Sequence, residues 1–211
     1  MTQKLRDELA EEINGWQKAA NYQGCPFKGY EKINPHRKDH PKVLKACLDH
    51  LKEKEYDLTG KSVIDVGSNI GFFAFSLRIA GAGQLYMVER QGRVQKVIRQ
   101  IVAIEGLKDV EVLGKKMHNV DQAKELPKCD IVVYKSVHHW IKKFSDEKTA
   151  EDIFREITSE ASAVIYEPCN FGKALPTDAD NSLAERCGFD TTVVIADGFK
   201  GRDIQVCLRS K

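Results

Sequence analysis

The stretch from Val63 to Arg90 reads VIDVGSNIGFFAFSLRIAGAGQLYMVER. Its first apolar run stops at Gly67, a helical pattern follows, and a second apolar run ends on Glu89. This order predicts a β-α-β unit with a tight glycine turn after its first strand. Such a turn lets a ligand approach the backbone closely, and it directs the free N–H groups of the next helix toward that ligand.

The acid at the end of the second run indicates a nucleotide. A carboxylate in that place can bind both hydroxyls of a ribose, and Glu89 follows the turn at about the distance found in dinucleotide-binding proteins. That fingerprint needs Gly-x-Gly-x-x-Gly, whereas here Gly67 and Gly71 flank Ser68-Asn69-Ile70. Asp65 inside the strand is also foreign to the fingerprint. A turn that binds nothing is the alternative, but a buried acid such as Asp65 is costly without a partner.

The pattern resembles motif I of the class I S-adenosylmethionine-dependent methyltransferases. The resemblance covers roughly Pro41 to the C-terminus. It implies a Rossmann-like α/β fold with a seven-stranded, mostly parallel sheet, an antiparallel C-terminal hairpin strand and helices on both faces. It also implies S-adenosylmethionine as cofactor, with Asp65, Gly67 and Gly71 at its methionine end and Glu89 at its ribose. We expect further cofactor contacts from the same strand ends, namely Ser68, Asn69, Phe72, Arg90, Met117, Lys135 and Ser136.

The adenine contact is left open by the sequence. In the family, the turn after strand three often supplies an acid to the adenine amino group. Here the nearest acid is Asp121, so Met117 packing on the ring or a backbone amide is the alternative.

The composition favours one domain with a small appendage. The chain has 211 residues, 42% of them apolar and 30% charged, and a formal charge of +2 that does not indicate bulk nucleic-acid binding. We expect residues 1–40 to form an N-terminal helix and a substrate or lid loop, and residues 41–211 to form the cofactor domain. The N-terminus has no apolar signal core and reads as mature protein, and no apolar run reaches the ~20 residues that span a bilayer.

Six scattered cysteines without a Cys-x-x-Cys pair favour a reducing, cytoplasmic location. No spacing typical of metal ligands occurs in the sequence, so we expect neither a metal nor a membrane partner. The sequence does not predict the oligomeric state.

Periodicity predicts the remaining elements. Helices are expected at residues 2–20, 70–80, 146–160 and 178–186. One further helix is expected to begin at Pro41, and another is expected to end near Gly106. Strands are expected at residues 62–66, 84–89, 110–113, 130–134, 163–167, 191–196 and 203–208. Residues 21–41 read as turns that mix aromatics with cations, which suits an anionic or planar substrate, and we expect substrate contacts from Tyr22, Tyr30 and Arg37. The alternative is a solvated loop whose aromatics pack on the domain.

Polar residues also follow strands four and five. The first segment reads Lys135-Ser136-Val137-His138-His139-Trp140, at a strand end where α/β sheets hold substrates. His138 or His139 is a candidate catalytic base, and Trp140 and Glu167 are candidate substrate contacts. The alternatives are a helix start with Trp140 and Ile141 in the core, and a helix cap at Glu167.

The resemblance implies in-line methyl transfer to an oxygen or nitrogen acceptor, which we expect between the N-terminal loop and the ends of strands four and five. The acceptor is a small molecule or RNA. Residues 135–141 and 165–168 are loosely similar to RNA 5′-phosphate methyltransferases, which would imply methylation of a phosphate. An NAD-type oxidoreductase on a Rossmann sheet and a non-catalytic cofactor-binding protein remain alternatives.

Overall fold

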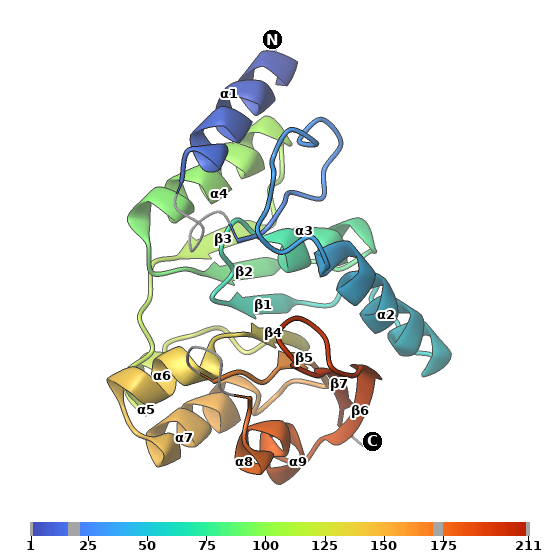
Figure 1. Cartoon of the computed structure of the whole chain (residues 1–211), viewed down its shortest axis with the longest axis vertical. Helices are drawn as coiled ribbons and strands as arrows, with labels where there is room; N and C mark the ends of the chain where they lie inside the picture. Colours follow the sequence, from blue (N-terminus) through green and yellow to red (C-terminus); the bar gives the residue numbers. More distant parts are fainter. Residues whose placement is uncertain (1, 17–21, 171–174, 210–211) are drawn as a thin grey trace.

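The computed structural model describes residues 2–16, 22–170 and 175–209. At its centre lies a seven-stranded sheet with the order β3-β2-β1-β4-β5-β7-β6 (Figure 1). The strands are β1 (Val63–Val66), β2 (Leu85–Val88), β3 (Val110–Leu113), β4 (Ile131–Lys135), β5 (Ala163–Glu167), β6 (Asp190–Ile195) and β7 (Ile204–Leu208). Strands β1 to β5 are parallel, and β7 is antiparallel to β5 and β6. The expected mostly parallel sheet with an antiparallel hairpin is therefore confirmed.

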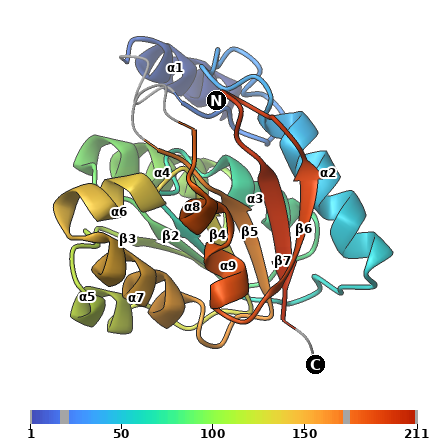
Figure 2. The same ribbon diagram turned by 60° about the horizontal axis from the view of Figure 1, so that its bottom comes forward.

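Helices cover both faces of this sheet (Figure 2). They are α1 (Thr2–Asn14), α2 (His40–Glu53), α3 (Phe72–Ile79), α4 (Gly92–Ile104), α5 (Val120–Lys124), α6 (His138–Phe144), α7 (Glu147–Ile157), α8 (Asp178–Asn181) and α9 (Leu183–Arg186).

Two apolar cores result from the alternation of side chains along each strand. In β4, Ile131 and Val133 join one core with residues of α1, α2, α3 and α4. Val132 and Tyr134 join the other core with residues of α5, α6, α7 and α9. The central strands β1, β4 and β5 are buried on both faces, as is typical of parallel sheets, whereas the outer strands β3 and β6 are partly exposed.

The described parts of the first forty residues, 2–16 and 22–40, contribute to the first of these cores. Leu9, Ile13, Tyr30 and Ile33 are buried in the same cluster as the sheet residues. Helix α1 lies beside α4 (Figure 1), where Arg6 pairs with Glu105 at 2.9 Å. The N-terminal segment is thereby held against the domain that carries the cofactor motif.

The order of the strands reverses at β1, which lies between β2 and β4. In open α/β sheets, the crevice beyond the strand ends at such a reversal is the usual place for a ligand. The Val63–Arg90 unit and the segment after β4 meet there.

Several expected elements differ at their ends. Helix α3 begins at Phe72 and not at Ile70, because Gly71 precedes it in a left-handed conformation (φ +89°). The apolar pattern of residues 70–80 predicts that Ile79 packs on the sheet, but Ile79 is 58% exposed, so this prediction is wrong. The expected helix at 178–186 is divided into α8 and α9 at Ser182. The first helix ends at Asn14, and residues 17–20 lie outside the described residues.

No helix in the described part of the chain combines the length and apolar character needed to cross a bilayer. All six cysteines are free. Within residues 2–16, 22–170 and 175–209, no three His, Cys, Asp or Glu side chains are grouped as metal ligands would be.

Candidate active site

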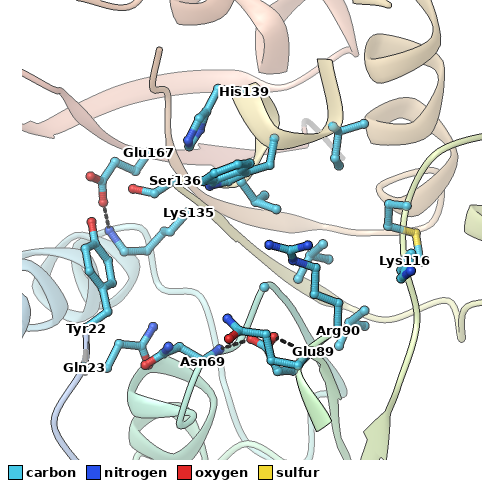
Figure 3. Close-up of a pocket in the computed structure, with 18 of the residues that line it drawn as sticks. Tyr22, Gln23, Asn69, Glu89, Arg90, Lys116, Lys135, Ser136, His139 and Glu167 are labelled. Atoms are coloured by element: carbon cyan, nitrogen blue, oxygen red, sulfur yellow. Dashed lines mark hydrogen bonds and ion pairs between the residues drawn. The ribbon is translucent and has the colours of Figure 1, made fainter. Parts of the chain in front are cut away.

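A cavity of about 580 Å³ lies at the carboxyl ends of β1, β2, β4 and β5. This volume is in the range of sites for small molecules and cofactors. Figure 3 shows two groups of polar side chains facing each other across it. Asn69, Glu89 and Arg90 lie on one side, and Tyr22, Lys135, Ser136 and Glu167 lie on the other.

The glycine turn after β1 forms part of the wall. Gly67 lines the cavity with φ +74°, and the N–H groups of Gly67 and Ser68 donate to the Val88 carbonyl at 2.9 and 3.0 Å. A Cβ atom on Gly67 would lie 3.3 Å from a methyl group of Val137. Since any side chain here would enter the space between β1 and β4, this glycine keeps the crevice open.

Gly71 has a different role from Gly67. It does not line the cavity, and a Cβ atom there would overlap Met87 and the Phe75 ring. The glycine therefore permits close packing of α3 on β2.

Glu89 is held rigidly at the rim. Its two carboxylate oxygens accept hydrogen bonds from the Asn69 N–H at 3.1 Å and from the Gln91 N–H at 2.8 Å. Burial raises the pKa of Glu89, and these two amides oppose the rise. The carboxylate is fixed in orientation and still borders the cavity, as a ribose ligand requires.

Asp65 lies behind the wall and not in it. Its side chain is buried under α3, and its Oδ2 atom has no hydrogen-bond partner among the described residues. Burial raises the pKa of Asp65 to about 7, although a hydrogen bond from the Ala74 backbone opposes this. The Ser68 hydroxyl is also fully buried without a partner in the part of the chain that the structure describes.

Glu167 is the centre of the opposite wall. The register of β4 and β5 places it beside Lys135, and the two side chains form an ion pair. Arg37 approaches from the N-terminal segment, with its Nη1 atom 2.9 Å from Oε1 of Glu167, and Arg202 lies 3.6 Å from the same oxygen. Burial alone would raise the pKa of Glu167, but the Lys135 and Arg37 cations hold it well below its usual range.

Arg37 is locked in place by its other contacts. It forms two bonds of 2.7 Å with the Asp39 carboxylate and donates to the Tyr22 hydroxyl at 2.9 Å. The Phe199 ring covers the guanidinium at 4.3 Å. Segments from both ends of the chain therefore meet over the carboxyl end of β5.

The two histidines after β4 occupy different environments. His139 borders the cavity, with Nδ1 2.6 Å from the Cys169 sulfur, whereas His138 lies behind it, with Nδ1 3.3 Å from the Tyr134 hydroxyl. Burial lowers the pKa of each imidazole to about 4, so both are neutral at pH 7. A neutral imidazole can accept a proton, but so low a pKa makes it a weak base.

Comparison with solved structures identifies the architecture. The bifunctional kinase-methyltransferase WbdD is similar over 95% of this chain and 46% of its own, with a TM-score of 0.70 and 14% identity. Magnesium protoporphyrin IX methyltransferase from Synechocystis PCC 6803, solved with bound SAM, is similar over 97% of this chain and 91% of its own, with a TM-score of 0.61 and 16% identity. The fold is that of a Rossmann-like methyltransferase.

The sequence comparisons are more limited. No family model matches the chain. An arginine N(omega)-methyltransferase from Streptomyces achromogenes subsp. streptozoticus is 31% identical over 68 residues. The match covers 32% of this chain and 19% of that relative, so this chain spans only a small part of the curated protein.

On this methyltransferase fold, most of the residues expected from the sequence gather at one crevice. Those that line the cavity are Gly67, Asn69, Glu89, Arg90, Met117, Lys135, Ser136, His139, Trp140, Glu167 and Tyr22. Those directly behind it, or packed against its walls, are Asp65, Ser68, Gly71, Phe72, His138 and Arg37. Asp121, the nearest acid after β3, does not line the cavity and is exposed.

Tyr30 is the exception, because it does not reach the crevice. It is 1% exposed and lies with its ring 5.6 Å from the Arg6 guanidinium, under α1. Trp140 is 42% exposed, so the alternative that placed it in the core is wrong, whereas Ile141 is buried.

Several lining residues were not singled out from the sequence as site residues. Gln23 fixes the start of α3 by accepting the Phe72 N–H at 2.8 Å, and Phe199, Lys200 and Arg202 come from the β6–β7 turn. His40 also lines the cavity, and neither ring nitrogen has a partner among the described residues. The sequence placed it only among the cations of a loop, but burial lowers its pKa to about 3 and leaves it neutral.

Proposed function

We propose that this protein is an S-adenosylmethionine-dependent methyltransferase that acts on an oxygen or nitrogen acceptor. The observation that carries the proposal is the geometry of Glu89, a carboxylate fixed by two backbone amides at the rim of the crevice, directly beside the glycine turn. The comparisons support it through the fold, and the Synechocystis structure holds SAM on that fold.

The residues present fit this cofactor. Glu89 would bind the ribose hydroxyls, Gly67 and Asn69 would face the amino-acid end, and Met117 and Arg90 would contact the base. Ser68, Gly71, Phe72 and Asp65 would support these groups from behind. When bound, the cofactor supplies an electrophilic methyl group on a sulfonium.

Positioning is the main contribution that this chain makes to the reaction. The acceptor would lie between the Tyr22–His40 segment and the ends of β4 and β5, against Tyr22, Lys135, Ser136 and Glu167. Holding the acceptor atom in line with the methyl group removes most of the entropic part of the barrier. His139, which borders the cavity and is neutral at pH 7, would accept a proton from an acceptor that loses one. His138 would support it from behind.

Calorimetry with S-adenosylhomocysteine tests the proposal. The parent protein should bind, and Glu89→Gln should bind roughly 10- to 100-fold more weakly because charge-assisted hydrogen bonds to the ribose are lost. Gly67→Arg should not bind, since its side chain would fill the crevice beside Val137.

Matched controls are Glu111→Gln on β3 and Gly15→Arg after α1, because both positions are exposed and neither lines the cavity. Both should bind like the parent. Parent-like affinity in Glu89→Gln and Gly67→Arg together would place the cofactor elsewhere and end the proposal.

A further inference from the structure

The polar wall opposite Glu89 holds more positive than negative charge. Its buried cations are Arg37, Lys135 and Arg202, whose side chains are 0%, 7% and 8% exposed. The carboxylates that face them among the described residues are Glu167 and Asp39. These three cations and two carboxylates therefore carry a net charge of +1, an arrangement that is costly in a buried site unless an anion binds.

Arg202 is the cation that is least satisfied by the protein. Its Nη1 atom donates to the Ser136 hydroxyl at 3.2 Å, and its distance to Glu167 is 3.6 Å. Its Nε atom is buried and has no hydrogen-bond partner among the described residues, although the residue lines the cavity. Arg37, by contrast, uses its Nε and both Nη atoms on Asp39, Glu167 and Tyr22.

The surroundings of Arg202 suit a ligand with a negative charge. Lys200 and His36 line the same end of the cavity, and His36 packs edge-on against Phe199 at 5.9 Å between ring centroids. Glu167, the acid in this wall, is already shared by three cations. A cationic acceptor would have to break these pairs to reach the Glu167 carboxylate.

We infer that the acceptor of this methyltransferase is anionic, and that Arg202 binds its carboxylate or phosphate group through its guanidinium, whose hydrogen-bonding capacity the protein leaves partly unused. The inference rests on the proposed function, because it names the acceptor class for the same site. It distinguishes this chain from its partial relative, whose name specifies arginine, a cation. Arg202 is thus a specificity-determining residue that enters the site from the β6–β7 turn.

The test follows the arginine Nε–H resonances of ¹⁵N-labelled protein during separate titrations with inorganic phosphate, acetate and methylguanidine at constant ionic strength. Each titration is run on the protein alone and on protein saturated with S-adenosylhomocysteine. The Arg202 signal is assigned by its absence from Arg202→Lys, with Arg202→Gln as a second variant and circular dichroism to verify folding. The control is Arg155→Lys, an exposed arginine of α7 outside the cavity.

Phosphate or acetate should shift the Arg202 signal both in the protein alone and in the protein saturated with S-adenosylhomocysteine. The anion that causes the larger shift indicates whether the acceptor group is a phosphate or a carboxylate. Arg202→Lys should bind that anion at least tenfold more weakly, and Arg155→Lys should bind it like the parent. An unshifted Arg202 signal in the parent overturns the inference, as does equal binding by Arg202→Lys or a response to methylguanidine alone. Anion binding that S-adenosylhomocysteine abolishes also overturns it, because the subsite would then serve the cofactor's own carboxylate.

The experiments distinguish an incorrect acceptor class from an incorrect cofactor assignment. Calorimetry reports directly whether S-adenosylhomocysteine binds, and the titration of the ligand-free protein reports the anion subsite independently of that result.

Discussion

Asp65 combines deep burial with an unpartnered carboxylate oxygen, and this sets a pH dependence of stability. Burial raises its pKa to about 7, against about 3.9 in an unfolded chain. At pH values between about 4 and about 7, Asp65 is protonated in the native state and ionised in the unfolded state. Stability therefore falls as the pH rises from about 4 to about 7 on account of this residue.

Asp65→Asn should remove this contribution, because an amide does not titrate. Relative to the parent, the variant should gain roughly 3 kcal/mol in the free energy of unfolding between pH 5 and pH 8, because about two pH units of this range lie below the raised pKa. Urea denaturation at pH 5 and pH 8 measures the difference, with Asp121→Asn as an exposed control that should follow the parent. If the difference in unfolding free energy between the parent and Asp65→Asn is the same at pH 5 and pH 8, the pKa of Asp65 is not raised by burial.

At the level of single residues, the sequence located the wall of the crevice formed by β1 and β2 better than the opposite wall. Gly67 and Glu89 line the crevice as expected, because local order along one β-α-β unit fixes their position. Arg202 and Phe199 were missed because their place depends on how the last hairpin pairs with β5, more than thirty residues away along the chain. Tyr30 was misplaced because an aromatic in a turn-rich segment can face either the core or the crevice.

Among the elements, β5 is joined to the N-terminal segment by one buried group, Glu167. Its carboxylate faces Arg37, Lys135 and Arg202 from three different parts of the chain. This charge is one contact shared by the segment before α2 and the β6–β7 turn, beside the Arg37–Phe199 and Arg202–Ser136 contacts.

Glu167→Gln should be strongly destabilising, by roughly 3–5 kcal/mol, because it leaves buried cations without a partner. Glu156→Gln is the matched control, since Glu156 pairs with Lys128 at a site where both side chains are about a quarter exposed. That control should lose about 1 kcal/mol or less. Urea unfolding compares the two variants, and equal losses would show that burial of the Glu167 cluster adds nothing.

The strands were predictable from their sequence, and the short helices were not. The strands Val110–Leu113 and Ala163–Glu167 match the expected ranges, since each apolar run is bounded by polar or turn residues. Helices α5 and α6 have 5 and 7 residues, too few to show a helical period. The left-handed start of α3 and the break at Ser182 arise from local hydrogen bonding that periodicity does not report.

Across the whole molecule, the strand reversal at β1 places the crevice where both halves of the sheet contribute to it. Ligand that binds only the folded state stabilises it by mass action. S-adenosylhomocysteine at 100 times its dissociation constant should add about 2.7 kcal/mol and raise the melting temperature by roughly 5–10 °C. NAD at the same concentration should have no effect, because the turn lacks the middle glycine of the dinucleotide fingerprint.

Differential scanning fluorimetry with both ligands makes this comparison. A shift in melting temperature with NAD and none with S-adenosylhomocysteine would favour the oxidoreductase alternative.

The overall architecture was predictable because β-α alternation followed by two consecutive strands is compatible with few topologies. The position of the β6–β7 turn at the crevice was not predictable, since no local sequence pattern encodes it.

Trp140 gives the protein a built-in optical reporter. The chain has two tryptophans, of which Trp140 lines the crevice beside Arg90 and Phe144 while Trp16 lies near Arg93. Replacing Trp16 with phenylalanine would leave a single indole emitter, whose quenching or spectral shift should track nucleoside arrival without any label. Unaltered emission at saturating S-adenosylhomocysteine would show that the indole does not sense the bound molecule.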